Sequence, residues 1–223
     1  MTPSPWSCPF VYAVGFDTRP DEPQAELDAF NEFYAAHLDD VMFRNPGFVR
    51  GARYELARTD PPGAGPRWLA VYGVDGEESA RGYAARERPK YPPGPPAWRR
   101  ATLVWRLLWR RTSWTGRDEV SAGPVALTGI DPADGATGPD FEHFSSRVHL
   151  PETSEAFGYD RCVRFELWRE LQHPEPGCPA YLTLYEAEVA PEPPARPAPL
   201  TPGPPTWEGR HVRWRLDYDL ITR

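Results

Sequence analysis

The sequence lacks most of the signatures that would assign a chemistry directly. It has only three cysteines, Cys8, Cys162 and Cys178, with no C-x-x-C pair and no histidine beside them at metal-ligand spacing. A glycine-rich phosphate loop and a serine nucleophile motif are also missing. These absences argue against a metal site, a nucleotide-dependent enzyme and a serine hydrolase. The odd cysteine count favours a reduced, cytoplasmic protein.

Long apolar runs and an excess of positive charge are missing as well. The most apolar window, 101–109, is short and contains Arg106, so we expect no segment that spans a membrane. The N-terminus shows no signal-peptide pattern. The 223 residues carry a formal net charge of −7, which argues against nucleic acid or an anionic membrane as a partner. The 29 prolines are clustered, and the clusters predict stiff loops.

An internal repeat is the strongest feature that is present. Residues 47–58 read GFVRGARYELAR and residues 158–169 read GYDRCVRFELWR, so Gly, three Arg, Glu and Leu recur at identical spacing. Three further blocks recur in the same order. In the block before this segment, Phe30 and Phe33 match Phe141 and Phe144, and His37 matches His149 after a slip of one residue. We therefore predict two fused copies of one unit, residues 1–118 and 119–223.

Hydrophobic periodicity predicts the same element order in each copy. Strands are expected at 10–16, 48–59, 68–74 and 101–113, and again at 125–130, 159–171, 181–189 and 211–221. Helices are expected from Leu27 to Val41, at 77–88 and from Asp140 onward. The resulting β-α-β-β-α-β order is ferredoxin-like. In the second copy, residues 191–205 are too rich in proline to form the second helix.

The strand patterns predict how the two copies pack. The strand at 68–74 is apolar on both rows, so both of its faces should be covered. We expect helices on one face and the sheet of the other copy on the other face, which gives an α+β fold with two sheets wrapped into one intramolecular barrel. Arg53 and Glu55, with their counterparts Arg164 and Glu166, are expected to project away from the helices into the space between the sheets.

Several motifs resemble the dimeric α/β-barrel superfamily. They are FNEFYAAHL at 30–38, NPGFV at 45–49, RY at 53–54 and RWLAVY at 67–72. That superfamily includes EthD-like proteins, cofactor-free antibiotic-biosynthesis monooxygenases, muconolactone isomerases, polyketide cyclases and haem proteins such as chlorite dismutase. Most members are homodimers of one unit, whereas this chain fuses two, so we expect a monomeric pseudo-dimer or a homodimer.

The resemblance implies a pocket in each half that takes a small apolar or aromatic molecule. We expect a tailoring enzyme of secondary metabolism that cyclises or isomerises an aromatic or polyketide-like substrate without a cofactor. A haem is not expected, because no helix or loop marks an axial histidine. The alternatives are a cofactor-free monooxygenase on a similar phenolic substrate and a non-catalytic binding protein. The working pocket is expected in the first half, where both helices are complete.

Eight residues are candidates for that site. His37 or Tyr72 would move a proton, and Arg53 or Arg106 would stabilise an anion. The expected substrate contacts are those of Tyr34, Trp68, Trp105 and Glu55.

Each candidate also has a plainer interpretation. His37 can be a core histidine that is hydrogen-bonded to a strand. The arginines and glutamates can form a network that fixes how the two halves dock. The aromatic residues at strand spacing can be ordinary core. Because His149 is out of register by one residue, the second half is the poorer candidate for catalysis.

Overall fold

Two units of similar topology follow each other along the chain. The structure, a computed structural model, describes residues 3–86, 91–133, 139–192 and 198–222. After a 3₁₀ turn, η1 (Pro5–Ser7), the first unit contains β1 (Phe10–Asp17), α1 (Gln24–Arg44), β2 (Phe48–Asp60), β3 (Trp68–Val74), α2 (Glu77–Ala85), α3 (Pro96–Arg100) and β4 (Thr102–Gly116). The second contains β5 (Val125–Asp131), α4 (Pro139–Phe144), the π-helical turn η3 (Ser145–His149), α5 (Leu150–Phe157), β6 (Arg161–Gln172), β7 (Tyr181–Glu186), α6 (Pro205–Glu208) and β8 (His211–Thr222).

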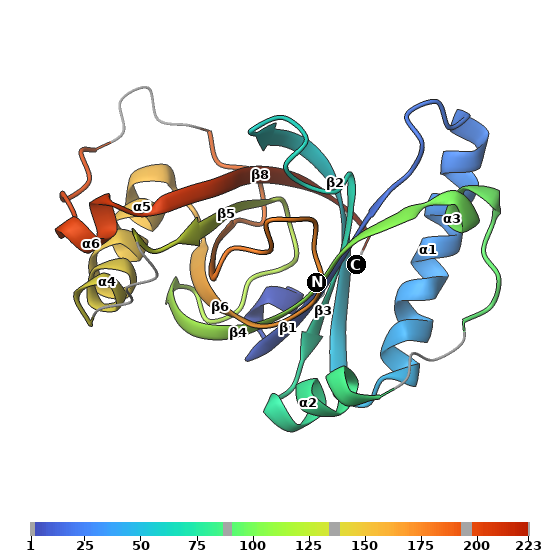
Figure 1. Cartoon of the computed structure of the whole chain (residues 1–223), viewed down its shortest axis with the longest axis horizontal. Helices are drawn as coiled ribbons and strands as arrows, with labels where there is room; N and C mark the ends of the chain where they lie inside the picture. The colour runs from blue at the N-terminus through green and yellow to red at the C-terminus, as the bar shows by residue number, and fades with distance from the viewer. Residues whose placement is uncertain (1–2, 87–90, 134–138, 193–197, 223) are drawn as a thin grey trace.

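The two sheets join edge to edge into one closed antiparallel barrel. The strand order is β1-β3-β2-β8-β5-β7-β6-β4, so β2 pairs with β8 and β4 pairs with β6 (Figure 1). Closure leaves no unpaired strand edge in the barrel. The predicted α+β class and the intramolecular barrel are therefore observed, and backbone hydrogen bonds join the two units at both seams.

The barrel interior is packed with apolar side chains. Inward-facing residues of both units meet there, and Trp6 of η1 adds its ring from one end, 5.8 Å from the ring of Phe165. Trp6 is fully buried. The interior is therefore a core and not a binding site. Its members are Val11, Ala13, Ala52, Tyr54, Leu69, Val71, Trp105, Leu107, Trp109, Val163, Phe165, Leu182, Leu184, Trp214, Leu216 and Tyr218 among others.

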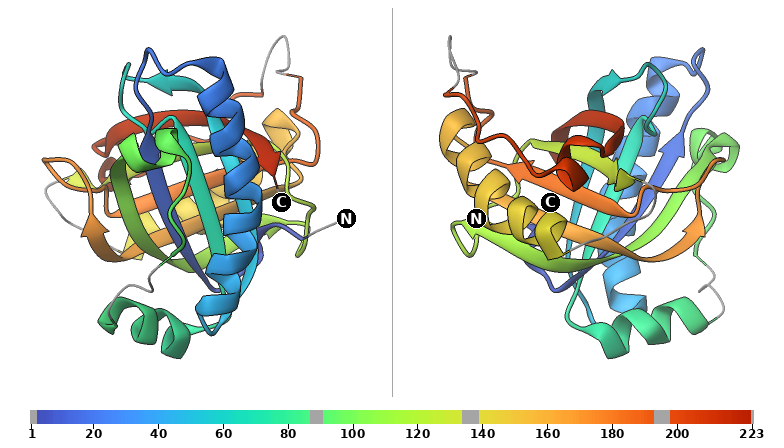
Figure 2. Two further views of the ribbon diagram at one scale, coloured as in Figure 1. Left: turned by 90° about the vertical axis from the view of Figure 1, so that its right-hand side faces the viewer. Right: turned by 60° about the vertical axis from the view of Figure 1, so that its left-hand side comes forward.

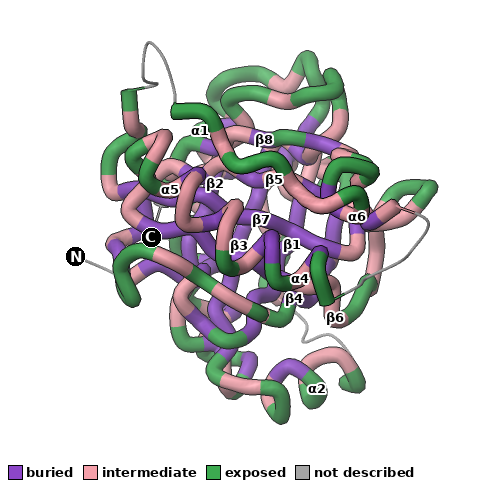
Figure 3. The backbone as a smooth tube through the Cα atoms, turned by 90° about the vertical axis from the view of Figure 1, so that its left-hand side faces the viewer, coloured by how far each residue is buried: buried purple, intermediate pink, exposed green. Residues whose placement is uncertain are grey.

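The helices pack against the outer faces of the barrel, one group for each unit. Helix α1 lies across the first sheet, and α4, η3 and α5 lie on the opposite side of the barrel (Figure 2). Figure 3 shows buried backbone concentrated in the strands, with exposed residues on the helices and loops around them. The buried face of α1 comprises Leu27, Phe30, Tyr34, His37, Leu38 and Val41, as its periodicity predicts.

The prediction for the two faces of β2 was wrong. Ala52 and Tyr54 face the barrel interior, whereas Arg53 lies on the outer face under α1. The Arg53 guanidinium stacks against the rings of Phe30, Tyr34 and Trp68 at 4.6–4.7 Å. On that face Arg53 gains both the rings of Phe30 and Tyr34 and a hydrogen bond from its Nη1 to the Asn31 amide oxygen of α1 over 2.7 Å. Side chains alternate along β2 as predicted, but the row that contains Arg53 faces α1 and not the barrel interior.

Arg164, the counterpart of Arg53 in the second unit, also lies on the outer face of its sheet. Arg164 on β6 stacks on Phe141 and Tyr181 on the outer face, and Glu166 forms a surface ion pair with Arg110 across the β4·β6 seam. Arg53 and Arg164 therefore do not form a network between the sheets. The buried polar link between the units comes from another arginine of the repeat: Arg161 pairs with Glu186 and donates to the Ser7 hydroxyl of the first unit over 2.6 Å.

Three smaller expectations from the sequence concern the helices, the cysteines and the proline-rich segment. No helix among the described residues has both the length and the apolar character needed to cross a membrane. All three cysteines are free thiols. Between β7 and α6, the described residues form no helix, in line with the proline content of that segment.

Candidate functional site

Each unit has a hollow between the outer face of its sheet and its helices. The hollow of the first unit has a volume of about 150 Å³, and that of the second about 710 Å³. We call them the small pocket and the large cavity. Small-molecule sites usually measure about 300–1,000 Å³, so only the large cavity is in that range.

The small pocket brings together half of the predicted site residues. His37 and Tyr34 come from α1, Tyr72 from β3 and Arg106 from β4. Nε of Arg106 donates a hydrogen bond to Oη of Tyr12 over 3.1 Å. The remaining lining is mostly aromatic and comprises Phe16, Tyr83, Tyr91, Trp98, Val14, Val41 and Leu103.

Burial controls the protonation of this pocket. It lowers the pKa of His37 to about 4, partly opposed by Asp40, so the imidazole is neutral at pH 7. The His37 ring lies 4.8 Å from the ring of Trp98 and 4.7 Å from that of Tyr91. Burial also raises the pKa of Tyr72 well above its ordinary value. The pocket therefore holds a neutral base among protonated phenols.

The other four predicted residues lie outside this pocket. Arg53 and Trp68 pack behind Tyr34, and the indole nitrogen of Trp68 donates to the Thr18 hydroxyl over 3.1 Å. Trp105 faces the barrel interior, 5.5 Å from Trp214, and does not line the small pocket. Glu55 is half-exposed in an ion pair with Arg67.

The strand ladders show that the small pocket and the large cavity are the same site in two copies. In the first unit, one outward-facing row crosses β3, β1 and β4 through Tyr72, Tyr12 and Leu108. In the second, the equivalent row crosses β7, β5 and β8 through Tyr185, Ala126 and Asp217. In the next row Val14 and Arg106 correspond to Thr128 and Arg215. Even the register shift before Phe16 recurs before Ile130.

The slip of one residue at His149 is absorbed by the π-helical turn η3. A π turn holds one residue more than an α turn, and such turns are frequent at functional sites. As a result, the His149 ring lies 4.6 Å from the ring of Trp207, much as His37 lies 4.8 Å from Trp98. The second copy therefore keeps its histidine in place, contrary to the expectation that lost register made it the poorer candidate.

The large cavity exists because bulky side chains of the first copy are missing from the second. Tyr12 becomes Ala126, and the proline-rich segment puts Ala190, Pro191 and Leu200 where the first unit has α2 with Tyr83. The histidine, tryptophan, tyrosine and arginine stay, as His149, Trp207, Tyr185 and Arg215. The copy in which the described residues form no second helix is thus the open one.

The histidine of the large cavity is neutral. Burial and, to a smaller extent, the nearby Arg210 lower the pKa of His149 to about 4, partly opposed by Glu152 and Glu208. The Arg210 guanidinium lies 4.2 Å from the centre of the Trp207 ring and donates to the Trp207 carbonyl over 2.8 Å. Tyr185, whose pKa is raised mainly by burial, also interacts with Arg210 and Arg215. A base, a phenol and cations therefore share one cavity.

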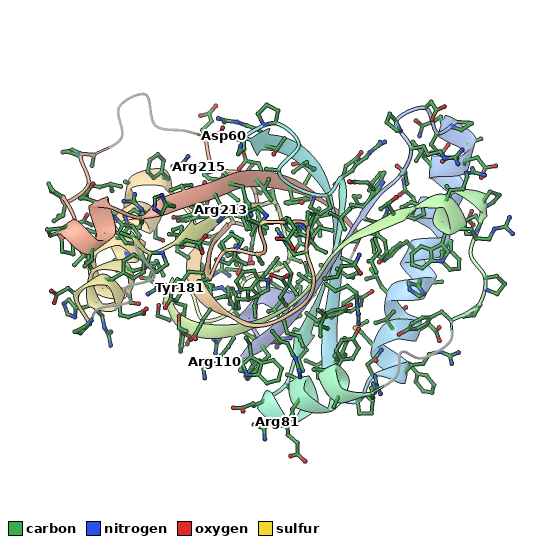
Figure 4. The ribbon with its side chains drawn as sticks, viewed as in Figure 1. Asp60, Arg81, Arg110, Tyr181, Arg213 and Arg215 are labelled. Atoms are coloured by element: carbon green, nitrogen blue, oxygen red, sulfur yellow. The ribbon has the colours of Figure 1, made fainter. Side chains whose placement is uncertain are left out.

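The cavity continues to the β2·β8 seam. Arg58 and Asp60 at the end of β2 line it beside Asp217 and Arg215 of β8. Asp60 and Arg215 form an ion pair at 3.7 Å, and Figure 4 shows the two side chains close together next to β8. Residues of both units therefore build this site.

Sequence reasoning missed Arg210 and Asp217. Both occupy positions where the two copies differ sharply in polarity, since Asp217 takes the place of the buried Leu108 and Arg210 aligns with Ala101. That reasoning looked for residues that the two copies share. A search for aligned positions that differ in polarity would have identified Arg210 and Asp217.

Comparison with known proteins supports the fold. No protein-family model matches the sequence, and no curated protein matches it. Among solved structures, the chain is similar to an anthrone oxidase-like protein, with 10% identity, a TM-score of 0.57, and coverage of 96% of this chain and 92% of that one. It is also similar to two mutants of chlorite dismutase from Candidatus Nitrospira defluvii, each with 10% identity and coverage of 95% and 90%. Their TM-scores are 0.50 and 0.51.

The contacts of His149 differ from those of a typical metal-binding imidazole. His149 is the histidine of the large cavity, but in the described part of the chain its ring donates to no carboxylate or carbonyl oxygen, the contact that orients a metal-binding imidazole. The cation Arg210 lies near it instead. No cluster of metal-binding side chains occurs within the described ranges either.

Proposed function

We propose that this protein is a small-molecule enzyme of the dimeric α/β-barrel type, and that it moves a proton on an aromatic or polyketide-like substrate in the large cavity. The observation that carries the proposal is the neutral imidazole of His149, held beside Arg210 and Tyr185 in a cavity of about 710 Å³. A cavity of this size suits a molecule of two or three fused rings.

The chemistry follows from the three polar groups. His149 removes a proton from an acidic C–H or O–H of the substrate, and the charge that develops on the substrate oxygen lies near Arg210 and the Tyr185 hydroxyl. In an isomerisation, the imidazolium then returns the proton to a different carbon. In a cyclisation, the carbanion attacks a carbonyl of the same molecule, and the imidazolium returns the proton to the alkoxide oxygen that forms. No electrons are lost or gained, so no cofactor is required.

Oxygenation is the second candidate, and the similarity to an anthrone oxidase-like protein favours it. The first step is the same, since the deprotonated substrate is the species that donates electrons to dioxygen. One oxygen atom would enter the ring as a carbonyl, and the other would leave as water together with the two hydrogens of the methylene carbon.

A matched pair of variants tests the assignment to the second unit. With anthrone and simple polyketide-like phenols as substrates, H149Q should lose turnover by at least about a hundredfold, the usual contribution of a positioned base. H37Q changes the equivalent residue of the small pocket and should retain turnover. The reverse pattern would move the activity to His37, Tyr72 and Arg106.

Two controls separate the remaining candidates. A126Y restores the side chain that Tyr12 provides in the first copy, so it should fill the large cavity and block binding. Assays under argon distinguish the reactions, because only oxygenation stops without dioxygen. Tight binding with no product under air or argon would instead identify a non-catalytic binding protein.

A further inference from the structure

Asp217 is the most unusual side chain in the wall of the large cavity. Its position in the first copy is occupied by Leu108, which is fully buried beneath an aromatic cluster. Replacement of an apolar core residue by a carboxylate costs free energy unless the carboxylate is hydrogen-bonded or solvated. Asp217 is only partly buried and lines the large cavity, which supplies that solvation and leaves the carboxylate facing the space where a ligand would bind.

The surroundings of Asp217 leave its carboxylate available. In the described part of the chain it makes no hydrogen bond and no ion pair within 4 Å. Arg58, opposite it on β2, and Asp219 act on it only at longer range. The carboxylate also influences the hydroxyl of Tyr159, whose ring lies 5.2 Å from that of Tyr185.

The strand ladder places Asp217 in line with the rest of the proposed site. Asp217 is directly opposite Ala126, which is opposite Tyr185, so one row runs across the cavity floor. Between Tyr185 and Asp217, the side chain on this row is the methyl group of Ala126. A flat ring system lying on Ala126 would have the phenol of Tyr185 at one edge and the carboxylate of Asp217 at the other.

We infer that Asp217 determines the specificity of the large cavity by accepting a hydrogen bond from a hydroxyl on the far side of the bound ring system, so that the substrates are polyhydroxylated aromatics. This inference rests on the proposed function. A carboxylate accepts hydrogen bonds and donates none when ionised, so it favours hydroxylated rings and disfavours ring carboxylates. Burial, which raises the pKa of Asp217, makes such a bond stronger than at an open surface.

Binding of naphthalene derivatives tests this inference without knowledge of the natural substrate. The probes are a naphthol and a set of dihydroxynaphthalenes that differ in the spacing of the two hydroxyls, titrated calorimetrically into the intact protein. The wild type should bind the best dihydroxynaphthalene at least about tenfold more tightly than the naphthol, as expected for a hydrogen bond to a charged group. D217L, which copies Leu108, should lose the preference for the dihydroxynaphthalene over the naphthol.

The remaining outcomes separate the two proposals. D217N keeps an acceptor oxygen and the side-chain shape, so it should retain part of the preference even if D217L does not fold. Equal affinities of the wild type for all probes would overturn the role of Asp217 and leave the proposed function intact. Absence of binding by any probe would overturn both. Failure of the proposed function alone would appear as full turnover in H149Q together with an unchanged hydroxyl preference.

Discussion

Arg53 and its counterpart Arg164 differ in one partner, and this difference predicts a stabilising substitution. In the second unit, both terminal nitrogens of Arg164 donate to the carboxylate of Glu142, at 2.6 and 3.1 Å. In the first unit, Arg53 donates only Nη1, to the Asn31 amide oxygen at 2.7 Å. Nε and Nη2 of Arg53 have no partner among the described residues, although the side chain is fully buried. N31E would supply the missing carboxylate.

The expected gain follows from the second unit. A hydrogen bond to a charged group contributes roughly 1.5–3 kcal/mol. The Glu142 side chain is 41% exposed, so solvent screens part of its interaction with Arg164. A glutamate at position 31 should therefore raise the free energy of unfolding by about 1–2 kcal/mol. For a protein of this size that corresponds to an increase in Tm of about 2–8 °C.

Urea unfolding followed by circular dichroism measures this gain. N31Q is the control for side-chain length and should have little effect. E142N is the matched change in the second unit and should destabilise, because it removes the carboxylate that Arg164 already has. If N31E left the unfolding midpoint unchanged or lowered it, Arg53 would not be short of a partner, and the comparison of the two copies would be refuted.

Two further predictions concern buried charge. Arg161 and Glu186 are an ion pair with both side chains at most 1% exposed, so E186A should cost about 3–5 kcal/mol, whereas R161M combined with E186L should recover most of that loss; equal losses in the single and double variants would contradict this. Burial lowers the pKa of His37 and His149 to about 4, so the folded state binds fewer protons than the unfolded state below pH 6.5. Stability should therefore fall as the pH drops from about 6.5 to 4, by at most about 2 kcal/mol for each histidine after solvent screening. H37Q and H149Q should each flatten that dependence, and an unchanged slope in the double variant would exclude the histidines as its cause.

The strand and helix order could be predicted because both copies repeat it. The same alternation occurs in both copies, so each copy supports the strand assignments of the other. The predicted bounds of β3 match the observed Trp68–Val74, and those of the other strands lie within a few residues of the observed ones. The faces of β2 could not be predicted in the same way. In a barrel with helices outside, both faces of a strand are buried, so alternation alone does not reveal which row faces the interior. The outer face gives Arg53 a hydrogen bond to the Asn31 amide oxygen of α1 as well as the ring of Tyr34, and strand alternation does not encode either contact.

The location of the larger hollow was also beyond the sequence argument. We expected a pocket where the helices are complete, but volume depends on which side chains fill the space under them. Tyr12 and Tyr83 fill it in the first unit, and Ala126 leaves it open in the second. Similarly, a slip of one residue in an alignment does not show that a π turn will return His149 to its place.

The unequal hollows have a consequence for how this chain can change. In a symmetric homodimer, every substitution occurs in both subunits. A mutation that creates a cavity in one subunit therefore creates it in the other as well, and the loss of stability doubles. Here Tyr12 and Ala126 are separate codons of one gene. The first half can keep a full core and carry much of the stability of the barrel through the shared seams, while the second half accepts the cost of an open site. Attempts to alter ligand preference should therefore vary the second half and leave the first as its support.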